Sequence, residues 1–227
     1  MRELAGAEYA NESVMPNTEM NRLVETLLEG DHAAALAESR RLRATGMASE
    51  RIVTEGLEAA MQRLDDKCTV ESFNLLEIML VGRAVSAVVN ELYPAGVPPE
   101  RGRDTFVIAT LEGDVHDLGK NIAKMVLNGK GYRVVDLGKD CPVETLVNAA
   151  EREHAHAVLV SGLITPVIPQ VRKVRPALDK RGLGGIRVVA GGAALKQSSP
   201  EALNVDYVAE TAFDGARYLD SLVRGAI

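Results

Sequence analysis

The spacing of apolar residues predicts helices in the first part of the chain. Before residue 95, four segments carry an apolar residue at every third or fourth position, which is the spacing of one face of an α-helix. The segments are bounded by residues that favour helix starts and stops: Thr18 and Gly30, Asp31 and Gly46, Ser49, and finally Ser72 to Leu92. Four antiparallel helices joined by short turns form a bundle.

From residue 104 onward the pattern changes to short apolar runs that alternate with helical segments. Strands are expected at 104–110, 132–137, 156–161, 186–190 and 205–209, and helices at 117–129, 142–153, 167–181, 196–202 and 211–224. This alternation predicts a parallel sheet covered by helices on both faces. Five such units suit the α/β class, as a flavodoxin-like (Rossmann-like), doubly wound, five-stranded sheet of strand order 2-1-3-4-5.

A change of composition separates the two patterns. The stretch Pro94-Ala95-Gly96-Val97-Pro98-Pro99 has the proline and glycine content of a linker. We therefore expect a flexible arm at 1–17, a helical bundle at 18–94, a linker at 95–103 and an α/β domain at 104–227.

Charge and composition narrow the classes of partner. The net charge is −6 at pH 7, whereas proteins that bind nucleic acids usually present a basic face. No signal peptide and no apolar run of membrane-spanning length is evident, so we expect no membrane partner. The two cysteines, Cys68 and Cys141, match no metal-binding spacing, which favours a reducing cytoplasm.

Three turns are expected to meet at one edge of the sheet. In this topology ligands bind beyond the carboxyl ends of the strands where the strand order reverses, between the first and third strands. There the first strand ends in Asp114-Val115-His116, the third in Ser161-Gly162-Leu163 and the fourth in Gly191-Gly192.

Taken singly, these residues have ordinary explanations. Asp114 or Asp117 could cap the following helix, and the glycines could serve tight turns. The turn lacks the glycines of a P-loop or a dinucleotide site, and Ser161 lacks the context of a hydrolase nucleophile. A receiver domain would need an aspartate where Ser161 stands.

Taken together, the turns resemble a known signature. The pattern Asp114-x-His116-x-x-Gly119, then Ser161-x-Leu163, then Gly191-Gly192 is similar to that of corrinoid proteins that bind cobalamin base-off, with a protein histidine on cobalt. The runs 112–122, 135–138 and 161–166 resemble the methyltransferase branch of that family. A helical module directly before the cobalamin domain is also the arrangement in methionine synthase and in small corrinoid proteins. The resemblance covers roughly residues 20–224.

The resemblance implies roles for individual residues. His116 would bind the cobalt, Asp114 would accept the second imidazole N–H, and Ser161 would complete the relay. Leu163, Thr165 and Gly191-Gly192 would line the slot for the nucleotide tail. The full set of implied cofactor contacts is Gly113, Asp114, Val115, His116, Asp117, Leu118, Gly119, Ser161, Leu163, Thr165, Gly191 and Gly192.

The helical module would then cover the methyl-bearing face of the corrin. Relatives carry an aromatic residue followed by Leu-Pro at the start of the fourth helix, whereas this chain reads Phe73-Asn74-Leu75-Leu76. Phe73, Asn74 and Val81 are the candidates for this cap, and they could equally be bundle core.

The function implied is that of a methyl carrier that does not catalyse alone. A substrate-specific methyltransferase would methylate cob(I)alamin, or a related corrinoid, to methylcobalamin, and an acceptor methyltransferase would pass the methyl group to tetrahydrofolate or coenzyme M. A corrinoid reactivation protein is a further expected partner. The alternatives are a cobalamin-dependent sensor or regulator acting through a protein partner and, less favoured because no substrate barrel is evident, a mutase subunit.

Overall fold

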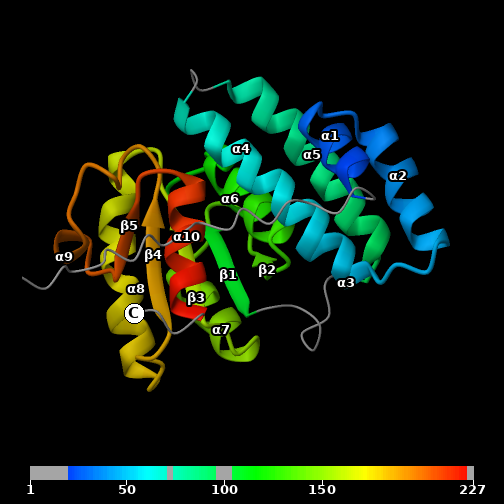
Figure 1. The fold of residues 1–227 in the computed structure, drawn as a ribbon. Coiled ribbons are helices and arrows are strands. Elements are labelled where there is room, and N and C mark those ends of the chain that lie inside the picture. The colour runs from blue at the N-terminus through cyan, green and yellow to red at the C-terminus, as the bar shows by residue number, and fades with distance from the viewer. Residues whose placement is uncertain (1–19, 71–73, 96–103, 224–227) are drawn as a thin grey trace, which may run out of the picture.

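The computed structural model describes residues 20–70, 74–95 and 104–223 (Figure 1). The predicted arm, residues 96–103 of the linker, and Thr18, Ser72 and Phe73 lie outside these ranges. The bundle helices are α1 (Asn21–Leu28), α2 (His32–Ala44), α3 (Ser49–Arg51), α4 (Glu58–Val70) and α5 (Leu75–Leu92). Within the described ranges, no helix is both long and apolar enough to cross a membrane.

The bundle follows the predicted pattern with two differences. Asp31 caps α2 as expected, since its carboxylate accepts hydrogen bonds from the amides of Ala33 and Ala34. The third predicted helix starts at Ser49, but a π-helical turn over Ile52–Leu57 joins α3 to α4. The fourth begins at Leu75, because the Asn74 side chain accepts a hydrogen bond from the Glu77 amide at 3.3 Å and caps the helix there.

All five predicted strands form, and they lie in one parallel sheet. The strands are β1 (Thr105–Thr110), β2 (Arg133–Asp136), β3 (Ala157–Ser161), β4 (Arg187–Gly191) and β5 (Tyr207–Ala209). Their order is β2-β1-β3-β4-β5, so the predicted doubly wound topology is confirmed. The register pairs Thr110 with Ser161 and Ser161 with Gly191, so the three predicted turns leave the sheet side by side.

Helices cover both faces of this sheet. The connecting helices are α6 (Leu118–Gly129), α7 (Val143–Arg152), α8 (Ile168–Lys180), α9 (Pro200–Leu203) and α10 (Ala212–Val223), with a 3₁₀ turn at Thr165–Val167 before α8. Side chains alternate along β1, so Val107 and Ala109 join the core beneath α7 and α8, while Phe106 and Ile108 join the other core. That second core also contains α6, α10 and the bundle, which lies beside the sheet in Figure 1.

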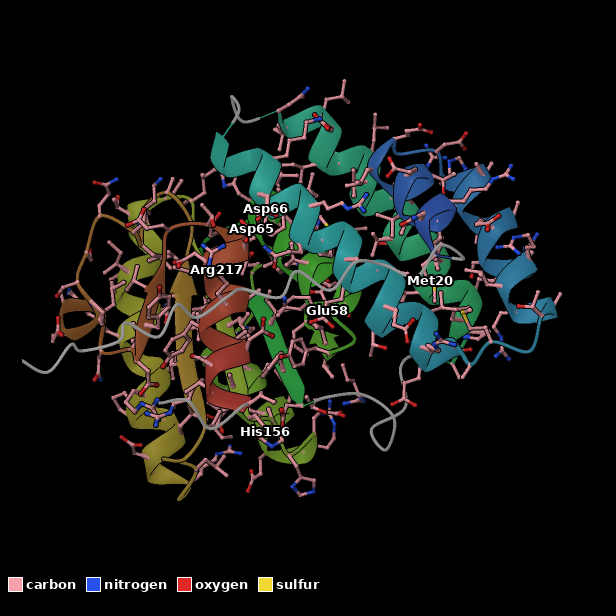
Figure 2. The ribbon with its side chains drawn as sticks, in the orientation of Figure 1. Met20, Glu58, Asp65, Asp66, His156 and Arg217 are labelled. Atoms are coloured by element: carbon pink, nitrogen blue, oxygen red, sulfur yellow. The ribbon has the colours of Figure 1, made fainter. Side chains whose placement is uncertain are left out.

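Small residues bring the bundle close to the sheet domain. A Cβ on Gly129 of α6 would stand 2.7 Å from the Met61 side chain of α4, and one on Gly82 of α5 would stand 3.1 Å from Met125 of α6. Arg217 of α10 forms an ion pair with Asp65 of α4, and Figure 2 shows these two side chains near each other. The bundle is therefore packed on the sheet domain over the helices that cover one face.

Candidate functional site

The site is built around a buried carboxylate that is saturated with hydrogen bonds. The Asp114 side chain is fully buried. Its Oδ1 accepts from the His116 amide at 2.9 Å and from His116 Nδ1 at 2.7 Å, and its Oδ2 accepts from the amides of Leu163 at 2.7 Å and Ile164 at 3.4 Å. Asp114 thus joins the loop after β1 to the loop after β3.

These bonds keep the carboxylate ionised. Burial alone would raise the pKa of Asp114, but the hydrogen bonds from the His116 amide, the Leu163 amide and the His116 ring hold its pKa below the ordinary value. An ionised carboxylate can only accept hydrogen bonds, so Nδ1 of His116 carries a proton in this contact. In neutral imidazole with that tautomer, Nε2 has a free lone pair and can serve as a metal ligand.

The His116 ring lies in an open, apolar setting. Its side chain is 49% exposed. Val115 and Leu118 beside it in the chain and Leu163 across the sheet edge are large apolar residues that are also about half exposed. Exposed apolar side chains on the loops that hold an imidazole suit a ligand with a broad apolar face.

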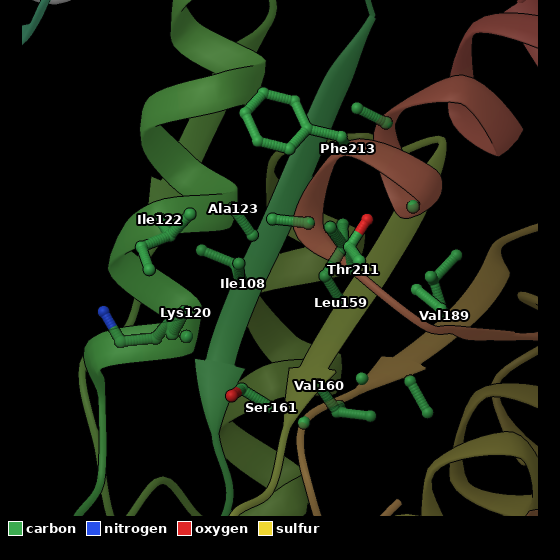
Figure 3. A pocket seen from close by; sticks show the side chains of 18 of the residues that line it. Ile108, Lys120, Ile122, Ala123, Leu159, Val160, Ser161, Val189, Thr211 and Phe213 are labelled. Atoms are coloured by element: carbon green, nitrogen blue, oxygen red, sulfur yellow. The ribbon is translucent and has the colours of Figure 1, made fainter. Parts of the chain in front are cut away.

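A cavity of about 420 Å³ is lined by Gly119 and Lys120, in the first turn of α6 after this loop, and enters the core (Figure 3). Strands β1, β3 and β4 contribute Ile108, Leu159 and Val189, and the helix α6 contributes Ile122 and Ala123. The polar side chains in its lining are Lys120, Ser161, Lys196, Glu210 and Thr211. The cavity is therefore a mostly apolar slot that begins at the carboxyl edge of the sheet.

Two adjacent glycines of the cavity have different reasons to be glycine. Gly192 has φ +106°, and a Cβ there would stand 2.4 Å from the carbonyl oxygen of Gly162, so the backbone itself requires glycine. At Gly191 the nearest atom to an added Cβ is 3.7 Å away. Gly191 therefore leaves space that the protein does not fill, as a cradle for a ligand would.

The structure brings most of the predicted site residues together but not all. Asp114, His116, Gly119, Ser161 and the Gly191-Gly192 pair meet at one edge, whereas neither Leu163 nor Thr165 lines the cavity. Leu163 instead donates its amide to Asp114. Ser161 lines the cavity. In the described part of the chain its hydroxyl is not among the groups bonded to Asp114, because the amides of Leu163 and Ile164 donate to Oδ2 of that carboxylate.

Of the three cap candidates, the structure describes Val81 and Asn74. Val81 is fully buried in the bundle core, which favours the core alternative, and Asn74 caps α5. The exposed apolar residues of α5 are Leu75, Leu76, Met79 and Leu80.

Sequence reasoning missed several residues of the cavity. They come from α5 and α10, and from the first turn of α6: Ile78, Phe213, Gly215, Ala216 and Lys120. The small residues at the start of α10 were the available signal, since Gly215 approaches the Cβ of Ala209 at the end of β5.

A second carboxylate supports the same region and gives a pH prediction. Burial alone would raise the pKa of Asp136, but the ammonium of Lys120 and the amide of Gly138 hold its pKa below the ordinary value. A carboxylate with a lower pKa in the folded state stabilises the fold above its unfolded pKa, and this contribution is lost as the pH falls through the folded pKa. We expect the free energy of unfolding, from urea titrations, to fall below about pH 4.

The control for this prediction is Asp136→Asn. Because the asparagine does not titrate, the variant should be less stable than the wild type at pH 7 but should lose less stability on acidification. Equal acid slopes for the two proteins would contradict the assignment to Asp136.

Sequence comparisons match the part of the chain that holds this site. The B12 binding domain family matches residues 105–217. The chain is 32% identical over 165 residues to dimethylamine corrinoid protein 2 of Methanosarcina mazei, covering 71% of this chain and 77% of the relative. It is 26% identical over 194 residues to trimethylamine corrinoid protein 1 of the same organism, covering 84% and 90%.

Solved structures share the fold. A chain of the methanol:cobalamin methyltransferase complex MtaBC from Methanosarcina barkeri matches with a TM-score of 0.79 at 23% identity, over 99% of this chain and 87% of that chain. A cobalamin-binding protein from Desulfitobacterium hafniense matches with a TM-score of 0.70 at 24% identity, over 88% and 97%.

Fold, site and relatives together define a cobalamin-binding α/β protein with a helical module before its sheet. More particularly, the chain belongs to the family of corrinoid proteins of methyltransferase systems. The resemblance noted in the sequence, and cobalamin or a related corrinoid as the cofactor, are confirmed.

Proposed function

We propose that this protein carries a methyl group on a base-off corrinoid whose cobalt is bound by His116. The observation that carries the proposal is the contact between Asp114 and His116 Nδ1, in the loop directly before α6, whose first turn lines a cavity together with Gly191 and Gly192. When bound, the corrin cobalt supplies the atom that accepts the methyl group and gives it up. The surrounding residues of the protein would bind and orient the cofactor.

In this proposal each group has a defined task. Asp114 fixes the tautomer and direction of the imidazole, so that Nε2 of His116 faces the ligand. Val115, Leu118 and Leu163 form an apolar floor, and the slot that includes Gly191 takes the nucleotide tail. A hydroxyl relay through Ser161 would need a rotation of Asp114 or a bridging water, because backbone amides hold the second carboxylate oxygen.

The helical part would protect the other face of the corrin. Residues 18–94 would form this cap, and 104–227 the cofactor-binding domain. The exposed apolar residues at the start of α5, from Leu75 to Leu80, are the described side chains of the cap that suit such contact.

Methyltransferases are the proposed partners, one specific for the methyl donor and one for the acceptor, with tetrahydrofolate or coenzyme M as the acceptor. Two relatives carry dimethylamine and trimethylamine in their names, and a solved chain of the same fold belongs to a methanol:cobalamin methyltransferase complex. Methylamines and methanol are therefore the donors to assay first. A protein that binds cobalamin but exchanges methyl groups with no methyltransferase would support the regulator instead.

The axial ligand is tested by electron paramagnetic resonance of the cobalt(II) form. An axial protein nitrogen splits the cobalt lines, and we expect this splitting to change when the histidines are labelled with ¹⁵N. His116→Ala should lose the labelled splitting and should bind cobalamin roughly 10–100-fold more weakly.

The matched control is His154→Asn. His154 is exposed and has φ +49°, a conformation that asparagine tolerates, so this variant should behave as the wild type. A labelled splitting that survives in His116→Ala would rule out His116 as the ligand.

A further inference from the structure

A buried lysine lies at the start of the helix that follows the histidine loop. Lys120 is in the first turn of α6, and its side chain is 2% exposed. Its Nζ is 2.7 and 2.8 Å from the two carboxylate oxygens of Asp136 and 2.8 Å from Oδ1 of Asn121. In Figure 3 the Lys120 side chain leaves α6 with its amino group turned away from Ile108. Since Asp136 ends β2, this pair ties the start of α6 to the neighbouring strand.

The charge of Lys120 stands where a helix does not favour it. The N-terminus of a helix carries a partial positive charge, so a cation in the first turn is unfavourable unless an anion neutralises it. Asp117, at the N-cap of α6, makes no capping hydrogen bond with its side chain. The start of α6 is therefore held by the Lys120–Asp136 pair and not by a side-chain N-cap.

The loop that follows Asp136 also holds the other end of the histidine loop. The Asp136 carboxylate accepts from the Gly138 amide at 2.9 Å. Two residues further, Asp140 Oδ1 accepts from the Gly113 amide at 2.9 Å, and the Asp140 amide donates to the Asp114 carbonyl at 3.1 Å. One short segment, 136–140, thus binds the chain on both sides of His116.

Stability alone does not account for such a pair. Replacing a buried ion pair by neutral groups of similar volume is often neutral or stabilising, because the pair must offset the loss of hydration of both charges. What the pair does supply is a fixed geometry between α6 and β2.

We propose that Lys120, Asp136 and Asp140 form a positioning clamp that holds the histidine loop, residues 113–117, in its ligand-binding conformation before the cofactor arrives. These are positioning residues, because none of them bonds to the imidazole of His116. The inference rests on the proposed function in that His116 is taken as the cobalt ligand. The clamp itself is a property of the cofactor-free chain.

The test is amide hydrogen exchange of the cofactor-free protein. The amides of Gly113 and His116 are bonded within the clamped loop and report on its opening. Lys120→Met combined with Asp136→Asn removes both charges and keeps an acceptor for the Gly138 amide. We expect these two amides to exchange roughly tenfold faster or more, with amides in β1 and β3 unchanged.

The matched control is Lys124→Met. Lys124 also contacts Asp136, at 3.2 Å, but its side chain is 39% exposed. This variant should exchange as the wild type does. Asp140→Ala should accelerate exchange of Gly113 as the double variant does.

Loading with cobalamin gives the second readout. The clamp variants should show a smaller fraction of histidine-bound cobalt in their spectra and weaker binding, while urea denaturation gives a midpoint close to that of the wild type. Wild-type exchange rates at Gly113 and His116 in the folded double variant would overturn the clamp. If instead wild-type protein showed no histidine on cobalt, the proposed function would fail, and the exchange measurement would still decide on the clamp.

Discussion

Asp114→Asn is expected to destabilise the protein by about 3 kcal/mol and to weaken cofactor binding. The carboxylate accepts from four N–H groups, two on each oxygen. An asparagine presents a donor in place of one oxygen, so in either orientation its NH₂ group meets N–H groups that have lost their acceptor. Urea denaturation measures the stability, and equilibrium binding of cobalamin should show a roughly 10–100-fold lower affinity.

The matched control for this prediction is Asp117→Asn. Asp117 lies in the same loop and the substitution changes the charge in the same way, but its side chain makes no capping hydrogen bond. We expect a change in stability within about 0.5 kcal/mol. An Asp114→Asn variant that matched this control in stability and bound cobalamin as tightly as the wild type would show that the carboxylate does not organise the site.

Gly192→Ala is expected to destabilise the protein as much as Asp114→Asn does, because of the backbone conformation at this position. The residue has φ +106°, and the new Cβ would stand 2.4 Å from the carbonyl oxygen of Gly162, a backbone atom that cannot move aside alone. Strain of this kind costs up to about 3 kcal/mol before the clash is added. We expect a large loss of stability in urea denaturation and a poor yield of folded protein.

Gly191→Ala is expected to weaken cofactor binding without a large effect on stability. Because the nearest atom to its Cβ is 3.7 Å away, this variant should fold with near wild-type stability. Its methyl group projects where the cavity lies, so cobalamin should bind more weakly. Unchanged binding by folded Gly191→Ala would show that the nucleotide tail does not pass this point.

The sheet could be predicted from sequence because its central strands are short, continuous apolar runs. Every residue of β1 is buried, and such a strand appears in sequence as a continuous apolar run between turns. The π-helical turn over Ile52–Leu57 could not be predicted. It lies where Gly56 fits against Leu23 of α1, a contact between segments distant in sequence.

The site residues also differ in whether local sequence or packing between distant segments sets their positions. The contact between Asp114 and His116 was implied by the resemblance, and the structure contains it. It joins residues only two apart, so it depends little on packing between elements. Leu163 is not among the residues that line the cavity, and the buried Val81 fits the bundle-core alternative. Both positions depend on packing between elements, which local spacing does not show. Lys120 was missed because a lysine in a helical first turn is usually solvated. It is buried because it pairs with Asp136, which lies at the end of strand β2.

The cavity of the site is also a gap in the hydrophobic core. Ile108, Leu159, Val189 and Phe213 line it, and all four belong to the core shared by the sheet, α10 and the bundle. A ligand group that enters the cavity completes this core, so its binding free energy adds to the free energy of unfolding. Folding and cofactor binding are then thermodynamically linked. The corrinoid would raise the melting temperature by an amount that grows with the logarithm of its affinity. A substitution that weakens the packing of this core would also weaken cofactor binding.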